Sequence, residues 1–148
     1  MIDGWFHTGD IGVLDGDGYL TIVDRKKDVV ISSGFNVYPK EIDEILFEHP
    51  DIVEACAVGI PDEKRGEAVK AYVVKRPESI LTEKDVILFC KKKLAGYKVP
   101  SKIEFIDEIP KSAIGKILRR KLKDRNEALP AASGRGIGLN TAPKGAGY

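Results

Sequence analysis

The chain contains few of the residues that commonly build catalytic or metal centres: it has two histidines, two cysteines and one tryptophan. Cys56 and Cys90 each lie inside an apolar pattern, without a CxxC partner or a histidine at ligand spacing. That arrangement argues against a zinc site and against a disulfide framework. We therefore expect two small buried thiols in a reducing compartment and no metal ligands in this chain.

Three motifs that mark common enzyme classes are also missing, namely GxSxG, HExxH and the phosphate-binding GxxxxGK[ST]. The pair Gly115-Lys116 is followed by Ile117 and lacks the upstream glycine that a phosphate-binding loop requires. Taken alone, the chain does not look like a complete enzyme.

Long hydrophobic runs and an excess of one charge are absent as well. No apolar run approaches the length of a membrane span, which is about 20 residues, and the N-terminal MIDGWFHTGD has no signal-peptide pattern. The 24 basic and 23 acidic residues leave a formal net charge of +1. This balance argues against binding of nucleic acid or membrane over the whole surface. We expect a cytoplasmic protein.

The patterns that are present indicate a small α+β domain with a sheet of two or three strands packed by helices. The DGDG segment between two apolar runs predicts a β-hairpin over residues 11–24. Residues 51–62 and 68–75 are expected to be strands that pair antiparallel, because the loop between them is too short for a crossover helix. The segment GFN, residues 34–36, is expected to be a loop.

Three helices are expected. One begins at Pro39, where a missing N–H costs nothing, and one at Thr82, which can serve as an N-cap. The third covers the basic segment after Gly115, with Ile117, Leu118 and Leu122 as its apolar stripe and the basic residues on its solvated face. Residues 126–148 are rich in Gly, Ala and Pro without periodicity, and we expect either a disordered tail or an artificial extension.

Four local features could carry chemistry, although each also has an ordinary structural interpretation. Asp10 in HTGD could bind a vicinal diol, or it is a solvated turn aspartate. The segment DRKKD, residues 24–28, could be a hinge, or an exposed loop. Gly34 could allow close approach of a ligand, or it is a loop glycine. Lys116 could reach a neighbouring site as a mobile charge, or it is a surface lysine at a helix start.

Together these features resemble a known family. GWFHTGDIG, DGYLTIVDRKKDVVISSGFNVYPKEIDEIL, VGIPDEKRGEAVKAYVV and LAGYKVPSKIEFIDEIPKSAIGKILRRKL follow one another as in the C-terminal part of the adenylate-forming superfamily. That superfamily comprises acyl-CoA synthetases, nonribosomal adenylation domains and firefly luciferases. The resemblance covers residues 3–124. It is closest to long- or medium-chain fatty acyl-CoA ligases, with aryl or 4-coumarate ligases as the alternative.

The resemblance implies a role for individual residues. Asp10 and Arg25 match residues that contact the ribose of ATP, and Lys27 matches the hinge. The loop that approaches the pantetheine of CoA is matched by Gly34, Phe35 and Asn36. Lys116 matches the lysine required for adenylation.

The resemblance also implies a domain organisation. Residues 1–26 match the last hairpin of a large N-terminal domain, and residues 27–125 match a mobile lid. The large domain, absent here, would carry the phosphate loop, the acyl pocket and the ligands of Mg²⁺. ATP, CoA and a carboxylic acid are the implied substrates, the large domain is the implied partner, and this chain alone should be inactive. Any membrane attachment would be peripheral and would act through the longer protein.

A different class of function remains open. Residues 116–125 contain six basic residues and one acidic residue, a local charge of +5 that could bind nucleic acid. The near-neutral total charge and the lack of interleaved aromatic residues argue against this alternative.

Overall fold

The α+β class is confirmed in a computed structural model, which describes residues 1–128. The strands are β1 (Asp10–Leu14), β2 (Leu20–Arg25), β3 (Val30–Ser32), β4 (Phe35–Val37), β5 (Ile52–Asp62), β6 (Gly66–Lys75) and β7 (Lys102–Phe105). The α-helices are α1 (Pro39–Phe47), α2 (Glu83–Lys91) and α3 (Arg119–Ala128), and two short 3₁₀ helices are η1 (Lys26–Asp28) and η2 (Gly96–Lys98). No helix within residues 1–128 is long and apolar enough to cross a membrane.

The sheet is larger than the two or three strands expected. It has five strands, with β6 at its centre. One edge of β6 pairs antiparallel with β5, as predicted, and the other edge pairs with β3 at Gly66 and, in parallel, with β7. The predicted hairpin of β1 and β2 forms a separate two-stranded sheet.

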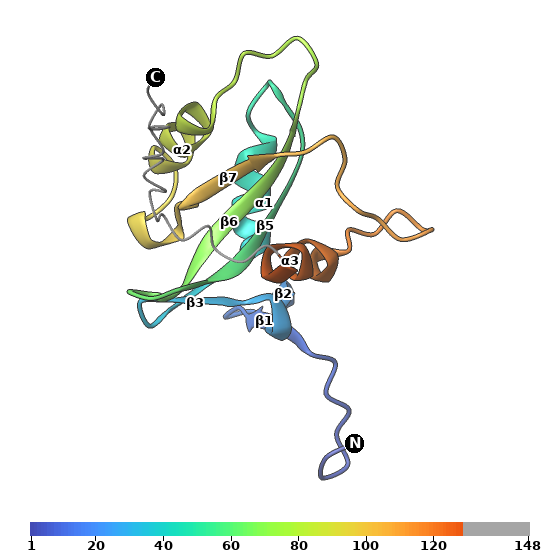
Figure 1. The fold of residues 1–148 in the computed structure, drawn as a ribbon. Helices are drawn as coiled ribbons and strands as arrows, with labels where there is room; N and C mark the ends of the chain where they lie inside the picture. Colours follow the sequence, from blue (N-terminus) through green and yellow to red (C-terminus); the bar gives the residue numbers. More distant parts are fainter. Residues whose placement is uncertain (129–148) are drawn as a thin grey trace, which may run out of the picture.

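The core lies on both faces of β5 and β6, because successive side chains of a strand point to opposite faces. On one face, Ala55 and Ala57 pack with the apolar sides of α1 and α2. On the other face, Cys56, Val58 and Ile60 pack with Leu122 of α3, so the predicted shared face of these three strand residues is confirmed. The helices thus cover opposite faces of the sheet (Figure 1).

Local signals at the two predicted helix starts are confirmed. Pro39 is the first residue of α1. Thr82 and Asp85 form a capping box at α2, in which each side chain satisfies a backbone N–H of the other. Cys56 and Cys90 are both free and buried, as expected.

Three expectations about local structure were wrong. Residues 126–128, expected to belong to a disordered or artificial tail, form the end of α3, and the rest of that expected tail lies outside the described residues. Phe35 and Asn36, expected to lie in a loop, belong to β4, which pairs with β3 from Val30–Val37 to Ser32–Phe35 around a turn at Gly34. The last helix begins only at Arg119, because Lys111 and Ile117 form a β-bridge and the Leu118 N–H donates to the carbonyl of Pro110. Lys116 therefore lies in a turn before the helix and not at the helix start.

Candidate functional site

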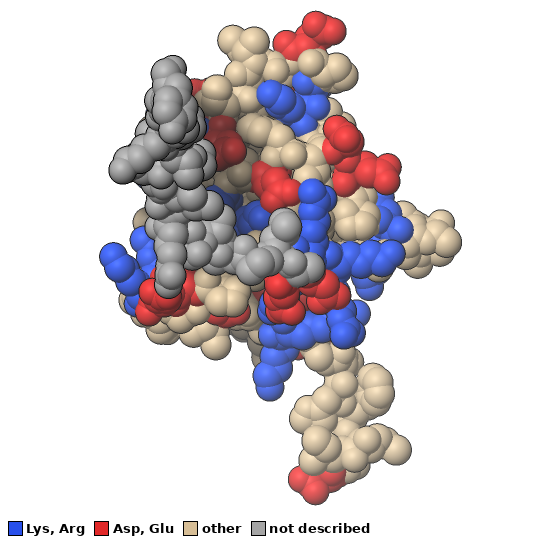
Figure 2. Space-filling view, in the orientation of Figure 1, with Lys and Arg blue, Asp and Glu red and all other residues tan. Residues whose placement is uncertain are grey.

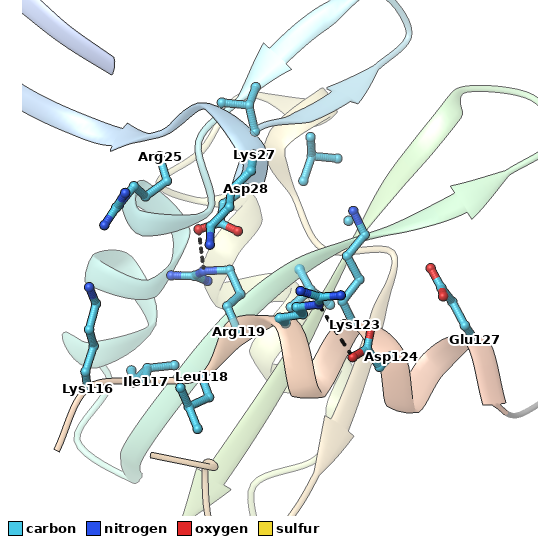
Figure 3. A pocket seen from close by; sticks show the side chains of 15 residues that line it. Arg25, Lys27, Asp28, Lys116, Ile117, Leu118, Arg119, Lys123, Asp124 and Glu127 are labelled. Atoms are coloured by element: carbon cyan, nitrogen blue, oxygen red, sulfur yellow. Dashed lines mark ion pairs between the residues drawn. The ribbon is translucent and has the colours of Figure 1, made fainter. Parts of the chain in front are cut away.

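A cavity of about 560 Å³ lies between η1, β5 and the start of α3. Three of the predicted site residues line it: Arg25 at the end of β2, Lys27 in η1, and Lys116 in the turn before α3 (Figure 3). Figure 3 shows Arg25 and Lys116 at the same end of the cavity. Residues 91 positions apart in the sequence therefore face one space.

Asp10 lies at the same end of the cavity, where it forms an ion pair with Arg25. It lies directly opposite Arg25 in the hairpin register, and its Oδ1 lies 3.0 Å from Nε of Arg25. The Arg25 guanidinium also donates to the carbonyl of Thr8, at 3.4 Å. Both charged side chains keep partial solvent exposure, 44% for Arg25 and 30% for Asp10. A carboxylate held in this way has a free oxygen that can accept hydrogen bonds from hydroxyl groups of a ligand.

Lys116 is exposed and is held by its backbone. Its N–H donates to Oγ of Ser112 at 3.2 Å, and its carbonyl accepts from the N–H of Ser112 at 2.8 Å. Gly115 before it has a φ of +81°, a left-handed conformation that favours glycine. This closed turn fixes the backbone while leaving the ammonium group free to reach a ligand.

Gly34, Phe35 and Asn36 do not line this cavity. They lie at the β3–β4 turn, where Gly34 has a φ of +81° and a Cβ placed on it would meet no atom within 4 Å. Phe35 is 55% exposed, and its ring stacks on Tyr97 with centroids 4.7 Å apart. The predicted site residues therefore divide into two groups: Asp10, Arg25, Lys27 and Lys116 around the cavity, and residues 34–36 at a separate turn.

The sequence interpretation missed Arg119, which it assigned to the solvated face of the last helix. The side chain is only 17% exposed, and its Nη2 lies 2.8 Å from Oδ2 of Asp43 in α1. It also donates to the carbonyl of Ala57, and its Nε lies 4.0 Å from Asp28 in η1. One signal was available: Arg119 precedes the apolar Leu122 by three residues and therefore shares its helix face.

Asp43 is a buried carboxylate that depends on these partners. It is 6% exposed, and its Oδ1 accepts from the Ala57 N–H at 2.6 Å. Burial raises the pKa of Asp43 to about 6, although Arg119 and the Ala57 N–H offset part of this effect. Burial opposes the charge of Arg119 too, but Asp43 outweighs it and the pKa of Arg119 is raised. The pair therefore stays ionised at neutral pH.

Asp24, the residue before Arg25, was also missed as an individual site residue. It is 7% exposed, and its two carboxylate oxygens accept separate backbone hydrogen bonds. Oδ1 accepts from the N–H of Arg25 at 2.7 Å, and Oδ2 accepts from the N–H of Lys40 in α1 at 3.0 Å. Asp24 thus links the hairpin to the first helix.

Comparisons with known proteins identify the family of the chain. Residues 41–116 match the family described as AMP-binding enzyme C-terminal domain. A long-chain-fatty-acid–CoA ligase of Escherichia coli O157:H7 is 57% identical over 122 residues, which are 82% of this chain and 22% of that protein. The chain therefore spans between a fifth and a quarter of the length of such relatives.

Solved structures give the same result. ATP-bound MatB from Rhodopseudomonas palustris superimposes with a TM-score of 0.79 at 38% identity, covering 84% of this chain and 25% of that one. A fatty acyl CoA synthetase of Mycobacterium tuberculosis gives a TM-score of 0.71 at 42% identity, covering 88% of this chain and 26% of that one. The fold, the sequence relatives and the motifs agree, and the chain belongs to the family of AMP-binding enzyme C-terminal domains.

Proposed function

We propose that the chain is the C-terminal part of an ATP-dependent long-chain fatty acyl-CoA ligase, in which it acts as a mobile lid. The relative at 57% identity bears that name, and a structural relative contains ATP. Residues 1–26 would complete the large domain, and residues 27–125 would form the lid. The N-terminal segment fits such an interface, because it exposes Trp5, Phe6, Leu14 and Leu20 by more than 60% each.

The observation that carries this proposal is the shared cavity of Arg25 and Lys116, with Asp10 paired to Arg25. In the first half-reaction a fatty carboxylate attacks the α-phosphorus of ATP and pyrophosphate leaves. Asp10 and Arg25 would hold the ribose hydroxyls. The Lys116 ammonium would stabilise negative charge that builds on the phosphate oxygens in the transition state. Ribose contact and charge stabilisation are needed together, and one cavity supplies both.

In the second half-reaction the CoA thiol attacks the acyl carbon and AMP leaves. Residues 34–36 lie apart from the cavity of Lys116, so both groups cannot serve one substrate position at once. Rotation about Lys27 in η1 would exchange them, and one site would serve two reactions in turn. The open space at Gly34 is suited to a ligand that passes close to the backbone.

ATP and CoA are thus the proposed substrates. For the Mg²⁺ that the superfamily implies, residues 1–128 contain no group of three or more His, Cys, Asp or Glu side chains that could hold a metal ion. We therefore assign its ligands to the large domain.

The basic segment offers less to nucleic acid than its sequence charge indicates. Arg119 pairs with Asp43, Arg120 with Asp124, and Arg125 with Glu104. Figure 2 shows acidic side chains beside basic ones on this face of the molecule. These pairs favour the lid function over a nucleic-acid-binding module.

A chimeric ligase tests the proposal. In it, residues 1–128 of this chain replace the matching C-terminal segment of the Escherichia coli relative. We expect ATP- and CoA-dependent formation of long-chain acyl-CoA at a rate within about tenfold of the parent, since each 1.4 kcal/mol of mismatch at the new interface costs a factor of ten. The large domain without any C-terminal segment is the control. A folded chimera no more active than this control would contradict the lid function.

A further inference from the structure

We propose that Asp24 is a positioning residue for the first half-reaction: its carboxylate holds the lid in the orientation that brings Lys116 to the cavity of Arg25. This inference rests on the proposed function, because it assumes that the lid, residues 27–125, turns relative to residues 1–26. It concerns the balance between the two orientations and not the chemical steps.

The first observation is how α1 begins. Its N-cap residue Tyr38 makes no side-chain capping bond, and Pro39 has no N–H to donate. The next N–H, that of Lys40, donates to Oδ2 of Asp24 at 3.0 Å. A carboxylate 16 residues upstream therefore supplies the cap that the local sequence does not. A negative charge at a helix N-terminus is favoured by the helix dipole and makes the hydrogen bond stronger.

The second observation is where this bond lies. Asp24 precedes the proposed hinge residue Lys27, and Lys40 follows it. Among residues 1–128, the Asp24–Lys40 bond is the one side-chain hydrogen bond or ion pair that joins residues 1–26 to the remainder. The pair Asp10–Arg25 lies wholly before the hinge, and the pair Arg119–Asp43 lies wholly after it.

Only a contact that crosses the hinge can favour one orientation of the lid over the other. Turning the lid about Lys27 carries Lys40 away from Asp24, whereas pairs on one side of the hinge move as units. An interaction shifts an equilibrium between two states only when it differs between them. The Asp24 carboxylate meets this condition. Because Asp24 is almost fully buried in the present orientation, the loss of its partner also changes its solvation.

Asp24 is linked to the reaction through the next residue in the sequence, Arg25. Its Oδ1 accepts from the N–H of Arg25, the residue proposed to contact ribose, while Oδ2 holds α1. One side chain thus fixes the backbone of Arg25 and the direction of the lid together. We infer that Asp24 favours the orientation for adenylation over the orientation for thioester formation.

The test is Asp24→Ala in the chimeric ligase, with the two half-reactions measured separately. We expect acyl-adenylate formation to fall about 10- to 100-fold, the loss that corresponds to one hydrogen bond to a charged group. Thioester formation from supplied acyl-adenylate should be unchanged or faster, because that orientation does not contain the bond. Asp24→Asn, which keeps an acceptor oxygen without the charge, should fall between. Asp17→Ala, which removes an exposed aspartate from the same hairpin, is the matched control.

A distance measurement keeps the test independent of activity. Spin labels on cysteines introduced at the exposed positions Asp17 and Lys92 report the hairpin-to-lid distance. With ATP bound, Asp24→Ala should move part of the population from the parent distance to a second one. Equal losses in both half-reactions, or an unchanged distance distribution, would overturn the inference. A parent chimera that makes no acyl-adenylate would count against the proposed function, and the distances would still decide the role of Asp24.

Discussion

Replacing Lys116 with alanine is expected to lower acyl-adenylate formation in the chimeric ligase by roughly 10²–10³-fold, the usual cost of removing one group that stabilises transition-state charge. The side chain is exposed at the tip of a closed turn, and its backbone bonds to Ser112 do not depend on the side chain. The lid should therefore fold normally. ATP–pyrophosphate exchange driven by a long-chain fatty acid measures the loss.

Thioester formation from supplied acyl-adenylate should stay within about twofold of the parent, a difference of under 0.5 kcal/mol, because Lys116 has left the site in the second orientation. Lys121→Ala, which removes an exposed lysine of α3 outside the cavity, is the control and should change neither step. An equal loss of both half-reactions would mean that Lys116 acts on the fold or on general binding. An undiminished pyrophosphate exchange would remove Lys116 from the mechanism.

Replacing Arg119 with glutamine is expected to lower the free energy of unfolding of the chain by about 3–5 kcal/mol, because it leaves a buried carboxylate without its cation. The partner Asp43 is 6% exposed, and Arg119 also donates to the carbonyl of Ala57. Urea denaturation measures the change. Arg120→Gln is the matched control, since Arg120 is 88% exposed and its pair with Asp124 is worth little.

The pH dependence of the destabilisation by Arg119→Gln shows whether the unpaired carboxylate of Asp43 causes it. Asp43 has a pKa of about 6 when folded, above the value of about 3.9 in an unfolded chain. The folded state therefore binds the proton more tightly, and the carboxyl costs stability as the pH rises from about 4 to about 6. Without Arg119 the folded pKa should rise further. The destabilisation by Arg119→Gln should then be larger at pH 8 than at pH 5, and adding Asp43→Asn should recover part of it. Equal losses for Arg119→Gln and Arg120→Gln would contradict this interpretation.

Local sequence signals predicted those parts of the fold that are determined locally. The DGDG turn, Pro39 at a helix start and the N-cap at Thr82 all depend on residues within a few positions of one another. The antiparallel pair of β5 and β6 likewise follows from a short connection. Each of these predictions is confirmed.

The errors arose where the partner is distant. The strand at β7 is visible in the local sequence, but its parallel pairing with β6, some 32 residues away, is not reported by any local pattern. Strand β4 has three residues and becomes a strand only through its pairing with β3. The late start of α3 follows from a β-bridge that holds Ile117 in extended backbone.

In the candidate site, too, local motifs were recognised from the sequence and contacts between distant residues were not. The motifs identified Asp10, Arg25, Lys27, residues 34–36 and Lys116, and their roles remain proposals. Which of these share a cavity became clear only from the folded chain. Arg119 and Asp24 were overlooked because their partners lie 76 and 16 residues away in α1, and neither contact is visible in a motif.

The most direct test of the alternating lid compares Lys116→Ala with Gly34→Leu, with both half-reactions measured on the same preparations. A side chain at Gly34 meets no atom of this chain within 4 Å, and its strain from a φ of +81° should cost only about 1–2 kcal/mol. The lid should therefore fold, while the leucine obstructs the approach of CoA. We predict opposite losses: Lys116→Ala loses adenylate formation and keeps thioester formation, and Gly34→Leu does the reverse. Loss of the same half-reaction in both variants would contradict the account.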